Sequence, residues 1–308
     1  MATTIEKKSY AHPEVLVDTE WVEKNLENQV VRIVEVDYNS SENYYSNHIP
    51  GSILFDWKKD MVNQFTRDII DKDQLKGLLA RSGVSDKTDL VLYGDYNNWF
   101  AAYAFWILKY YGLRNVKLMN GGRKKWLLEN RPLSSEIQSY ESDEITANLF
   151  PRDSIRAYFS QVRRAINRKD KILLDVRNGR EYSGEDLTSP EYPNECSQVG
   201  GHIPGAISVP WMLAVNEDGS FKSTEELKSL YESKGITSDK EIITYCRLGE
   251  RSSHSWFVLK YLLGYAHVRN YDGSWAEWGN TIRTPVEKFR YQGAVSGERR
   301  ARSSTSLG

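Results

Sequence analysis

Short apolar segments alternate along this chain with longer segments in which apolar residues recur at helical spacing. The apolar segments are rich in Val, Ile and Leu and predict strands near 30–37, 52–56, 89–94, 116–120, 171–177, 206–210, 241–246 and 267–271. The segments between them predict helices near 72–82, 98–111, 122–129, 156–167, 224–234, 252–263 and 274–279. This alternation predicts an α/β fold in which each parallel sheet is flanked by helices on both faces.

The two halves of the chain share sequence as well as pattern. The segment His48-Ile49-Pro50-Gly51-Ser52-Ile53 returns as His202-Ile203-Pro204-Gly205-Ala206-Ile207, and a tryptophan follows each copy at an equivalent distance. Leu108-Lys109-Tyr110 likewise returns as Leu259-Lys260-Tyr261. Because the matches keep the same order, we expect a duplicated domain.

The repeat sets the expected domain limits. The first domain is expected at 1–133 and the second at 153–290. The polar, acidic segment 134–152 lies between Pro132 and Pro151 and is expected to be the linker. Residues 291–308 are small, basic and polar, which predicts a disordered tail.

Composition narrows the functional classes. The chain has 308 residues, of which 40% are hydrophobic and 27% charged, as in soluble globular proteins, and its formal net charge of -1 gives no general attraction to nucleic acid or membranes. It has no apolar run long enough to span a bilayer and no signal-peptide core. Two cysteines exclude a disulfide framework, and no Cys/His cluster has zinc spacing. We expect a cytoplasmic protein without metal, nucleic-acid partner or membrane contact.

Cys246 is the candidate nucleophile. It follows the predicted strand 241–246 and precedes a predicted helix, so backbone N–H groups and the helix dipole should favour a thiolate there. Arg247 and Arg251 add positive charge beside the thiol, and Gly249 allows the chain to bend. The competing interpretation is an inert buried cysteine, which is the usual state of a free cysteine.

The length of the cysteine loop distinguishes a site for a phosphoryl group from a site for one added sulfur atom. Cysteine phosphatases and arsenate reductases carry Cys-x5-Arg around a tetrahedral anion, whereas Cys246 and Arg251 form Cys-x4-Arg. The shorter loop suits one extra sulfur atom on the cysteine better than a phosphoryl group. In the first half the equivalent segment is Gly94-Asp95-Tyr96-Asn97-Asn98-Trp99, which has no cysteine or arginine. We therefore expect the first domain to shape the site and the second to carry the chemistry.

Several segments of the chain resemble the tandem-domain rhodaneses, most closely those that act on thiosulfate. These segments are the paired HIPG motifs, NGGRKKW, YCRLGERSSHSWF and YDGSWAEW. The resemblance covers about Val15 to Phe289. It implies two rhodanese-like domains and a sulfurtransferase without cofactor, in which Cys246 takes the outer sulfur of thiosulfate and passes the persulfide sulfur to cyanide, a small thiol or a thioredoxin-like acceptor. Such covalent catalysis predicts ping-pong kinetics.

The resemblance also implies roles for other residues. Substrate contacts are expected from the loop residues Arg247, Leu248, Gly249, Glu250 and Arg251, and the donor-binding arginine is expected to be Arg180, with Arg177 second. Leu248 replaces a lysine of the vertebrate thiosulfate enzymes, and Glu250 places a negative charge inside the loop. A cleft wall facing Cys246 is expected from Tyr38, Trp99, Phe100 and Trp211.

For several other candidate residues, a role outside catalysis is the simpler interpretation. His48 and His202 occupy the same motif in both halves, including the half without a nucleophile, so we expect structural roles for both. A packing role is also expected for His254. Cys196 is expected to be an ordinary loop cysteine rather than a resolving thiol.

Two other functions stay open at this stage. Arg247 directly after Cys246 is similar to the thiosulfate enzymes, whereas mercaptopyruvate enzymes usually have glycine there, so 3-mercaptopyruvate sulfurtransferase is the second enzymatic hypothesis. A persulfide carrier, fed by a partner protein and without turnover of small donors, is the hypothesis from a different class.

Overall fold

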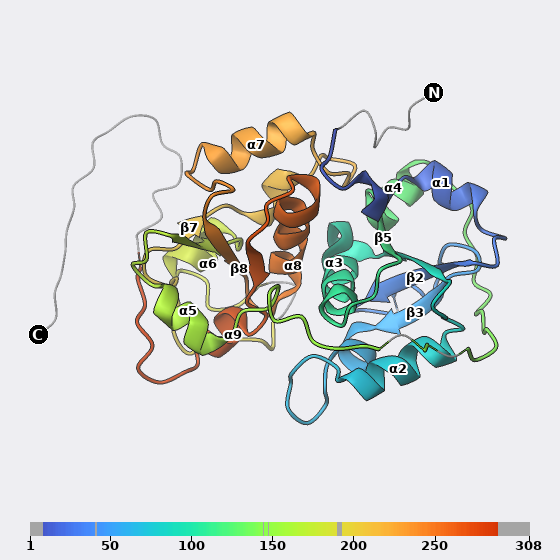
Figure 1. Ribbon diagram of the computed structural model, residues 1–308, viewed down its shortest axis with the longest axis horizontal. Coiled ribbons are helices and arrows are strands. Elements are labelled where there is room, and N and C mark those ends of the chain that lie inside the picture. Colours follow the sequence, from blue (N-terminus) through green and yellow to red (C-terminus); the bar gives the residue numbers. More distant parts are fainter. Residues whose placement is uncertain (1–8, 41, 144, 147, 190–192, 289–308) are drawn as a thin grey trace, which may run out of the picture.

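The computed structural model describes residues 9–40, 42–143, 145–146, 148–189 and 193–288. These residues form two α/β units that lie side by side (Figure 1). The expected tail, 291–308, lies outside the described residues. Within the described part of the chain, no helix is both long enough and apolar enough to cross a membrane.

The first unit is built on a parallel sheet of five strands. In spatial order these are β1 (Leu16–Val17), β5 (Val116–Met119), β4 (Asp89–Tyr93), β2 (Val31–Asp37) and β3 (Ile53–Asp56). Its helices are α1 (Thr19–Lys24), α2 (Lys72–Arg81), α3 (Asp95–Tyr110) and α4 (Gly122–Leu128), with short helical turns η2 (Pro13–Val15) and η3 (Trp57–Met61). Every residue of β2 is buried, as expected for a central strand covered on both faces.

The second unit repeats the plan with four strands. Their spatial order is β7 (Ile207–Ser208), β6 (Lys171–Asp175), β8 (Glu241–Tyr245) and β9 (Val268–Asn270), again all parallel. The helical elements are α5 (Phe159–Ala165), α6 (Gly179–Ser183), η4 (Trp211–Ala214), α7 (Thr224–Glu232), α8 (Glu250–Phe257), η5 (Val258–Leu262) and α9 (Ser274–Trp278). This order matches β3-β2-β4-β5 of the first unit, so the expected α/β fold with a repeated parallel sheet is confirmed.

The predicted elements differ from the observed ones mainly at their ends. The short elements β1, α1 and α6 were not predicted, because two to six residues are too few for a periodic pattern. The helix expected at 252–263 begins earlier, at Glu250, and changes to a wider helical turn at Val258. The described residues between α4 and α5 form no helix or strand.

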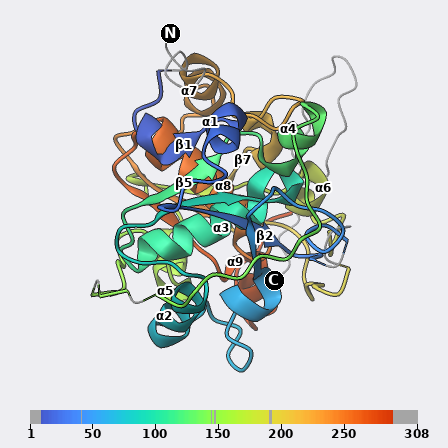
Figure 2. The same ribbon diagram turned by 90° about the vertical axis from the view of Figure 1, so that its right-hand side faces the viewer.

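Helices α3 and α8 form the centre of the contact between the units (Figure 1). Nearly all of α3 is buried because one side covers its own sheet and the other meets the second unit. The Phe105 ring lies edge-on to Phe257 and Tyr261, with ring centroids 5.0 and 5.2 Å apart. Figure 2, which turns the first unit toward the viewer, shows α3 crossing the middle of the molecule in front of α8. Such aromatic contact holds the two sheets in a fixed relation.

Candidate active site

Cys246 directly follows β8 and is fully buried. Its Sγ atom accepts a hydrogen bond from the Gly249 N–H at 3.2 Å. The Cys246 N–H donates to Ser274 Oγ at 3.0 Å, and the Ser274 hydroxyl donates in turn to the Tyr271 carbonyl at 2.7 Å. The cysteine therefore sits in a fixed pocket of backbone groups, with one amide already directed at its sulfur.

Gly249 makes this loop geometry possible. It has φ +107°, and a Cβ atom there would lie 3.1 Å from Asp272 Cα and from the Tyr103 ring. Its carbonyl accepts from the side chains of Ser252 and Ser253, at 3.0 and 2.8 Å. The first amides of α8 have no acceptor within their own helix, which makes this helix end suited to an anion.

The two loop arginines bind an acidic residue outside the loop. Both are buried and pair with Glu181 on α6: Arg247 Nη2 lies 3.0 Å from Oε1, and Arg251 Nη1 lies 2.7 Å from Oε2. Although burial favours the neutral acid, the charge and hydrogen bonds of Arg251, with Arg177 and Arg247, lower the pKa of Glu181 to about 2. Both arginines share the one carboxylate of Glu181, so a net positive charge stays beside the loop while the ion pairs hold the loop in shape.

Arg247 also fixes the segment between α6 and β7 that has no counterpart of equal length in the first unit. Its Nη1 donates to the carbonyls of Leu187 and Glu195, at 2.8 and 2.9 Å, and to Ser197 Oγ at 3.2 Å. The residue next to the nucleophile thus ties this inserted segment to the loop.

The two expected donor-binding arginines each pair with acids of their own segment. The Arg180 side chain is 61% exposed and pairs with Asp186 and Glu185. Arg177 is fully buried and binds its neighbour Asp175 and the Gly201 carbonyl. The residue directly after Arg180, Glu181, is the one that reaches the loop. Sequence reasoning missed it because an acidic residue did not fit a search for anion binders.

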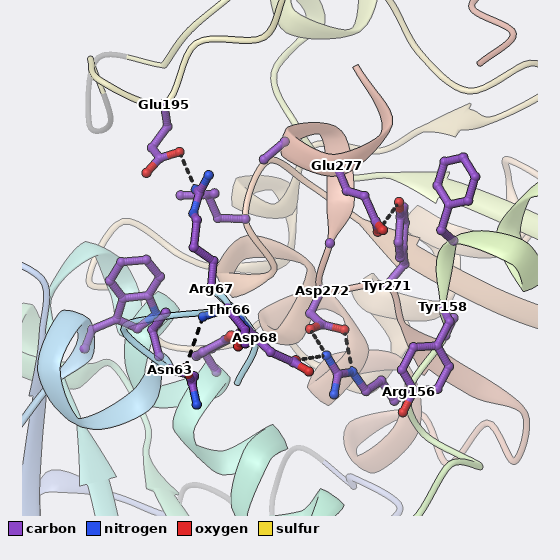
Figure 3. Close-up of a pocket in the computed structure, with 18 of the residues that line it drawn as sticks. Asn63, Thr66, Arg67, Asp68, Arg156, Tyr158, Glu195, Tyr271, Asp272 and Glu277 are labelled. Atoms are coloured by element: carbon purple, nitrogen blue, oxygen red, sulfur yellow. Dashed lines mark hydrogen bonds and ion pairs between the residues drawn. The ribbon is translucent and has the colours of Figure 1, made fainter. Parts of the chain in front are cut away.

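A cavity of about 960 Å³ lies between the two units (Figure 3). Leu248 of the loop is one of the residues that line it. The first unit contributes Tyr38, Trp57 and the segment 62–68, and the second contributes residues around Arg156 and Asp272. Arg67 pairs with Glu195 at 2.8 Å, and Arg156 Nη2 lies 2.7 Å from Asp272 Oδ2 and also pairs with Asp68. The Arg67–Glu195 and Arg156–Asp68 pairs join the units, whereas the Arg156–Asp272 pair lies within the second unit. None of them was predicted from the sequence.

The expected aromatic wall divides into two groups. Tyr38 lines the cavity and stacks on Phe100, with ring centroids 5.6 Å apart. Trp99 and Trp211 instead pack edge-to-face at 4.9 Å, and the Arg251 guanidinium lies over Trp99 at 5.6 Å. The second group therefore supports the loop rather than lining the cavity, and Trp57, which was not predicted for this role, takes a place in the lining.

The three candidate histidines, His48, His202 and His254, are buried and packed against other side chains. His48 stacks on Tyr44 and His202 stacks on Tyr182, and in both cases Nδ1 contacts that tyrosine's carbonyl at 2.8 Å. The same arrangement in both units fits a structural role. His254 is fully buried, and burial lowers its pKa to about 3, so it is neutral.

Neither Cys196 nor the first unit's equivalent of the cysteine loop provides a second candidate active site. Cys196 is exposed, and its thiol lies 3.4 Å from the Pro193 carbonyl. The described residues contain no group of His, Cys, Asp or Glu side chains suited to hold a metal ion. In the first unit, the segment equivalent to the cysteine loop has three consecutive left-handed residues, Tyr96, Asn97 and Asn98, and lacks a nucleophile.

The family model and the relatives found by sequence comparison agree on one family. The model of the rhodanese-like domain matches twice, at residues 18–129 and 159–281. The chain is 52% identical over 282 residues to the sulfur carrier protein TtuD of Thermus thermophilus, covering 91% of this chain and 98% of TtuD. It is 49% identical to a putative thiosulfate sulfurtransferase of Mycolicibacterium smegmatis, covering 90% of this chain and 99% of the relative.

Solved structures agree on the fold. An anaerobic ergothioneine biosynthesis enzyme from Chlorobium limicola, in complex with trimethyl histidine, matches with a TM-score of 0.80 and 25% identity, covering 91% of this chain and 71% of that one. A structure of EanB with a cysteine persulfide and ergothioneine matches with a TM-score of 0.79 and 25% identity, over 91% of this chain and 71% of that one.

Proposed function

Because this chain belongs to the rhodanese family of sulfurtransferases, we propose that it moves the outer sulfur of thiosulfate to cyanide or a thiol acceptor through a persulfide on Cys246. The thiolate attacks the outer sulfur, a Cys246 S–S bond forms, and the S–S bond of thiosulfate breaks with release of sulfite. An acceptor then removes the added sulfur and restores the thiolate. No proton or external oxidant is needed in either step.

The hydrogen bond from the Gly249 N–H to Cys246 Sγ is the observation that supports this proposal most strongly. An amide directed at sulfur favours the anionic thiolate and, after transfer, the anionic persulfide. Further amides in the first turn of α8 are suited to hold the added sulfur. The loop thus offers the same kind of stabilisation before and after the transfer.

In this proposal Arg247 and Arg251 bind Glu181 and thereby hold the loop in shape. Donor and acceptor approach from the cavity between the units, where Leu248 faces the open space. Cations at this cavity include Lys58, which is exposed, and Arg67, whose side chain is 68% exposed. They are the groups we propose to attract an anionic donor, in place of Arg180.

Comparative kinetics test the donor. Purified protein is given thiosulfate or 3-mercaptopyruvate with cyanide in excess, and thiocyanate is measured. The proposal predicts a higher kcat/KM with thiosulfate and no turnover by Cys246→Ser. A higher kcat/KM with mercaptopyruvate would assign the second enzymatic function instead, and full turnover by Cys246→Ser would remove the proposed nucleophile.

A persulfide carrier is the second candidate, because TtuD, at 52% identity, is named a sulfur carrier. In that case a partner protein loads Cys246, and small donors give little turnover. Rapid loading by a cysteine desulfurase, together with negligible loading by thiosulfate, would favour the carrier. The two unpaired cysteines fit a reducing compartment, so we propose the cytoplasm as the location for either function.

A further inference from the structure

Glu250 is a buried acid inside the cysteine loop, and the reaction as described gives it no task. It is the first residue of α8 and directly follows Gly249, whose N–H donates to Cys246 Sγ. Its side chain is fully buried, and neither carboxylate oxygen has a hydrogen-bond partner on another described residue. A carboxylate in such a place is costly to ionise, which favours the neutral acid.

The charged and titratable groups around Glu250 strengthen this preference. Tyr103 faces it from α3, Asp272 from the turn after β9, Glu195 from the inserted segment, and Arg251 from its own helix. Burial is the main cause that raises the pKa of Glu250, and the carboxylates of Glu195 and Asp272 raise it further, to about 8. Arg251 opposes the shift, but its guanidinium is bound to Glu181.

Charge counting shows why the protonation state matters. The thiolate carries one negative charge and thiosulfate carries two, so the first step already gathers three at a buried sulfur. An ionised Glu250 would add a fourth next to the residue that donates to the sulfur. A neutral Glu250 adds none, and like charges at short distance in a protein interior repel strongly.

On the footing of the thiosulfate reaction above, we propose that the neutral carboxylic acid of Glu250 lets the Cys246 loop admit a dianionic sulfur donor. Loss of its proton closes the loop to that donor. Glu250 is then a specificity-determining residue, and its effect depends on the donor's charge. A donor with the same transferable sulfur but a single negative charge, such as methanethiosulfonate, is affected less.

The test is the pH dependence of steady-state sulfite release from thiosulfate, with cyanide as the acceptor. Wild-type protein is compared with Glu250→Gln, which stays neutral at every pH, and with Glu225→Gln, which removes an exposed acid from the first turn of α7. Above about pH 8, kcat/KM of the wild type and of Glu225→Gln falls about tenfold per pH unit, through a rise in KM. The Glu250→Gln variant keeps its plateau.

An alkaline fall in Glu250→Gln that equals that of the wild type overturns the role of Glu250 while leaving the thiosulfate reaction intact. Wild-type protein that releases no sulfite at any pH rejects both. If Glu250→Gln does not fold, the wild type alone tests the proposal. Its kcat/KM for thiosulfate, divided by its kcat/KM for methanethiosulfonate, is expected to fall above about pH 8. A ratio that stays constant overturns the proposal.

Discussion

Glu181 and Arg251 form a buried, two-pronged ion pair beneath the cysteine loop: Nη1 donates to Oε2 at 2.7 Å and Nη2 donates to Oε1 at 3.0 Å. Arg247 binds the same carboxylate from the other side, at 3.0 Å. One acid on α6 therefore fixes both arginines of the loop. The loop's shape depends on a residue far from it in sequence.

The first prediction follows from this arrangement. Glu181→Gln leaves two buried guanidinium groups without a full negative charge, and breaking buried pairs of this kind costs about 3–5 kcal/mol. The free energy of unfolding, measured in denaturant at neutral pH, is expected to fall by that amount, and persulfide formation on Cys246 is expected to slow. Unchanged stability would show that the arginines do not depend on Glu181.

The same residue should make the wild type acid-sensitive. The folded-state pKa of Glu181, about 2, is below its ordinary value of 4.5. Its contribution is therefore fully present above about pH 4.5 and is lost as the pH falls toward 2. Denaturation curves between those pH values should lose stability more steeply in the wild type than in Glu181→Gln.

The second prediction concerns the bend of the loop. Gly249→Ala places a Cβ at φ +107° and 3.1 Å from Asp272, so the amide that donates to Cys246 Sγ must move. The rate of persulfide formation is expected to fall at least about tenfold, since a hydrogen bond to a charged group is worth about 1.5–3 kcal/mol. Stopped-flow sulfite release measures it.

Gly77 provides the matched control. It lies in the middle of α2, is exposed, and has no atom within 4 Å of an added Cβ. Gly77→Ala should leave persulfide formation unchanged and raise stability by about 0.5–1 kcal/mol, because alanine favours a helix interior. Equal rates for both variants would argue against a special role of Gly249.

The third prediction concerns a buried acid in the first unit. Asp37 ends β2, and burial, together with the charges of Glu35 and Asp95, raises its pKa to about 9. The folded protein therefore holds a proton that the unfolded chain releases. Stability should fall as pH rises between about 4 and 9, by up to about 1.4 kcal/mol per pH unit.

Asp37→Asn should flatten this slope and stabilise the protein at the alkaline end. Thermal unfolding across that pH range measures the difference. Parallel curves for the wild type and Asp37→Asn would contradict the assigned titration.

The fourth prediction compares two ion pairs at the cavity, one within the second unit and one between the units. The Arg156 and Asp272 side chains are 9% and 11% exposed, whereas Arg67 and Glu195 are 68% and 32% exposed. Removing one partner of a buried pair costs about 3–5 kcal/mol, while an exposed pair contributes about 0–1 kcal/mol. Arg156→Met should therefore destabilise strongly and Arg67→Met hardly at all. Similar losses in denaturant unfolding would refute this ranking.

The sequence was sufficient for the fold and for the place of Cys246. An apolar β-branched strand, a glycine and a helical pattern are local signals, and the structure puts Cys246 directly after β8. The repeat added the expectation of a duplicated domain, and the strand order β7-β6-β8-β9 of the second unit indeed matches β3-β2-β4-β5 of the first.

The partners of the loop could not be inferred in the same way. Arg247 and Arg251 look like free cations in the sequence, and only the tertiary fold brings Glu181 to them. Arg180 looked like the donor-binding residue, yet the helical turn of α6 points it to solvent while Glu181 points inward. Adjacent residues on a helix face different directions, so a one-residue error changes the role completely.

Intact-mass analysis after treatment with thiosulfate tests the central claim most directly. The account predicts that the wild type gains the mass of one sulfur atom, that cyanide removes it, and that Cys246→Ser never gains it. A wild-type mass that stays unchanged after thiosulfate, or a gain that persists in Cys246→Ser, would contradict it.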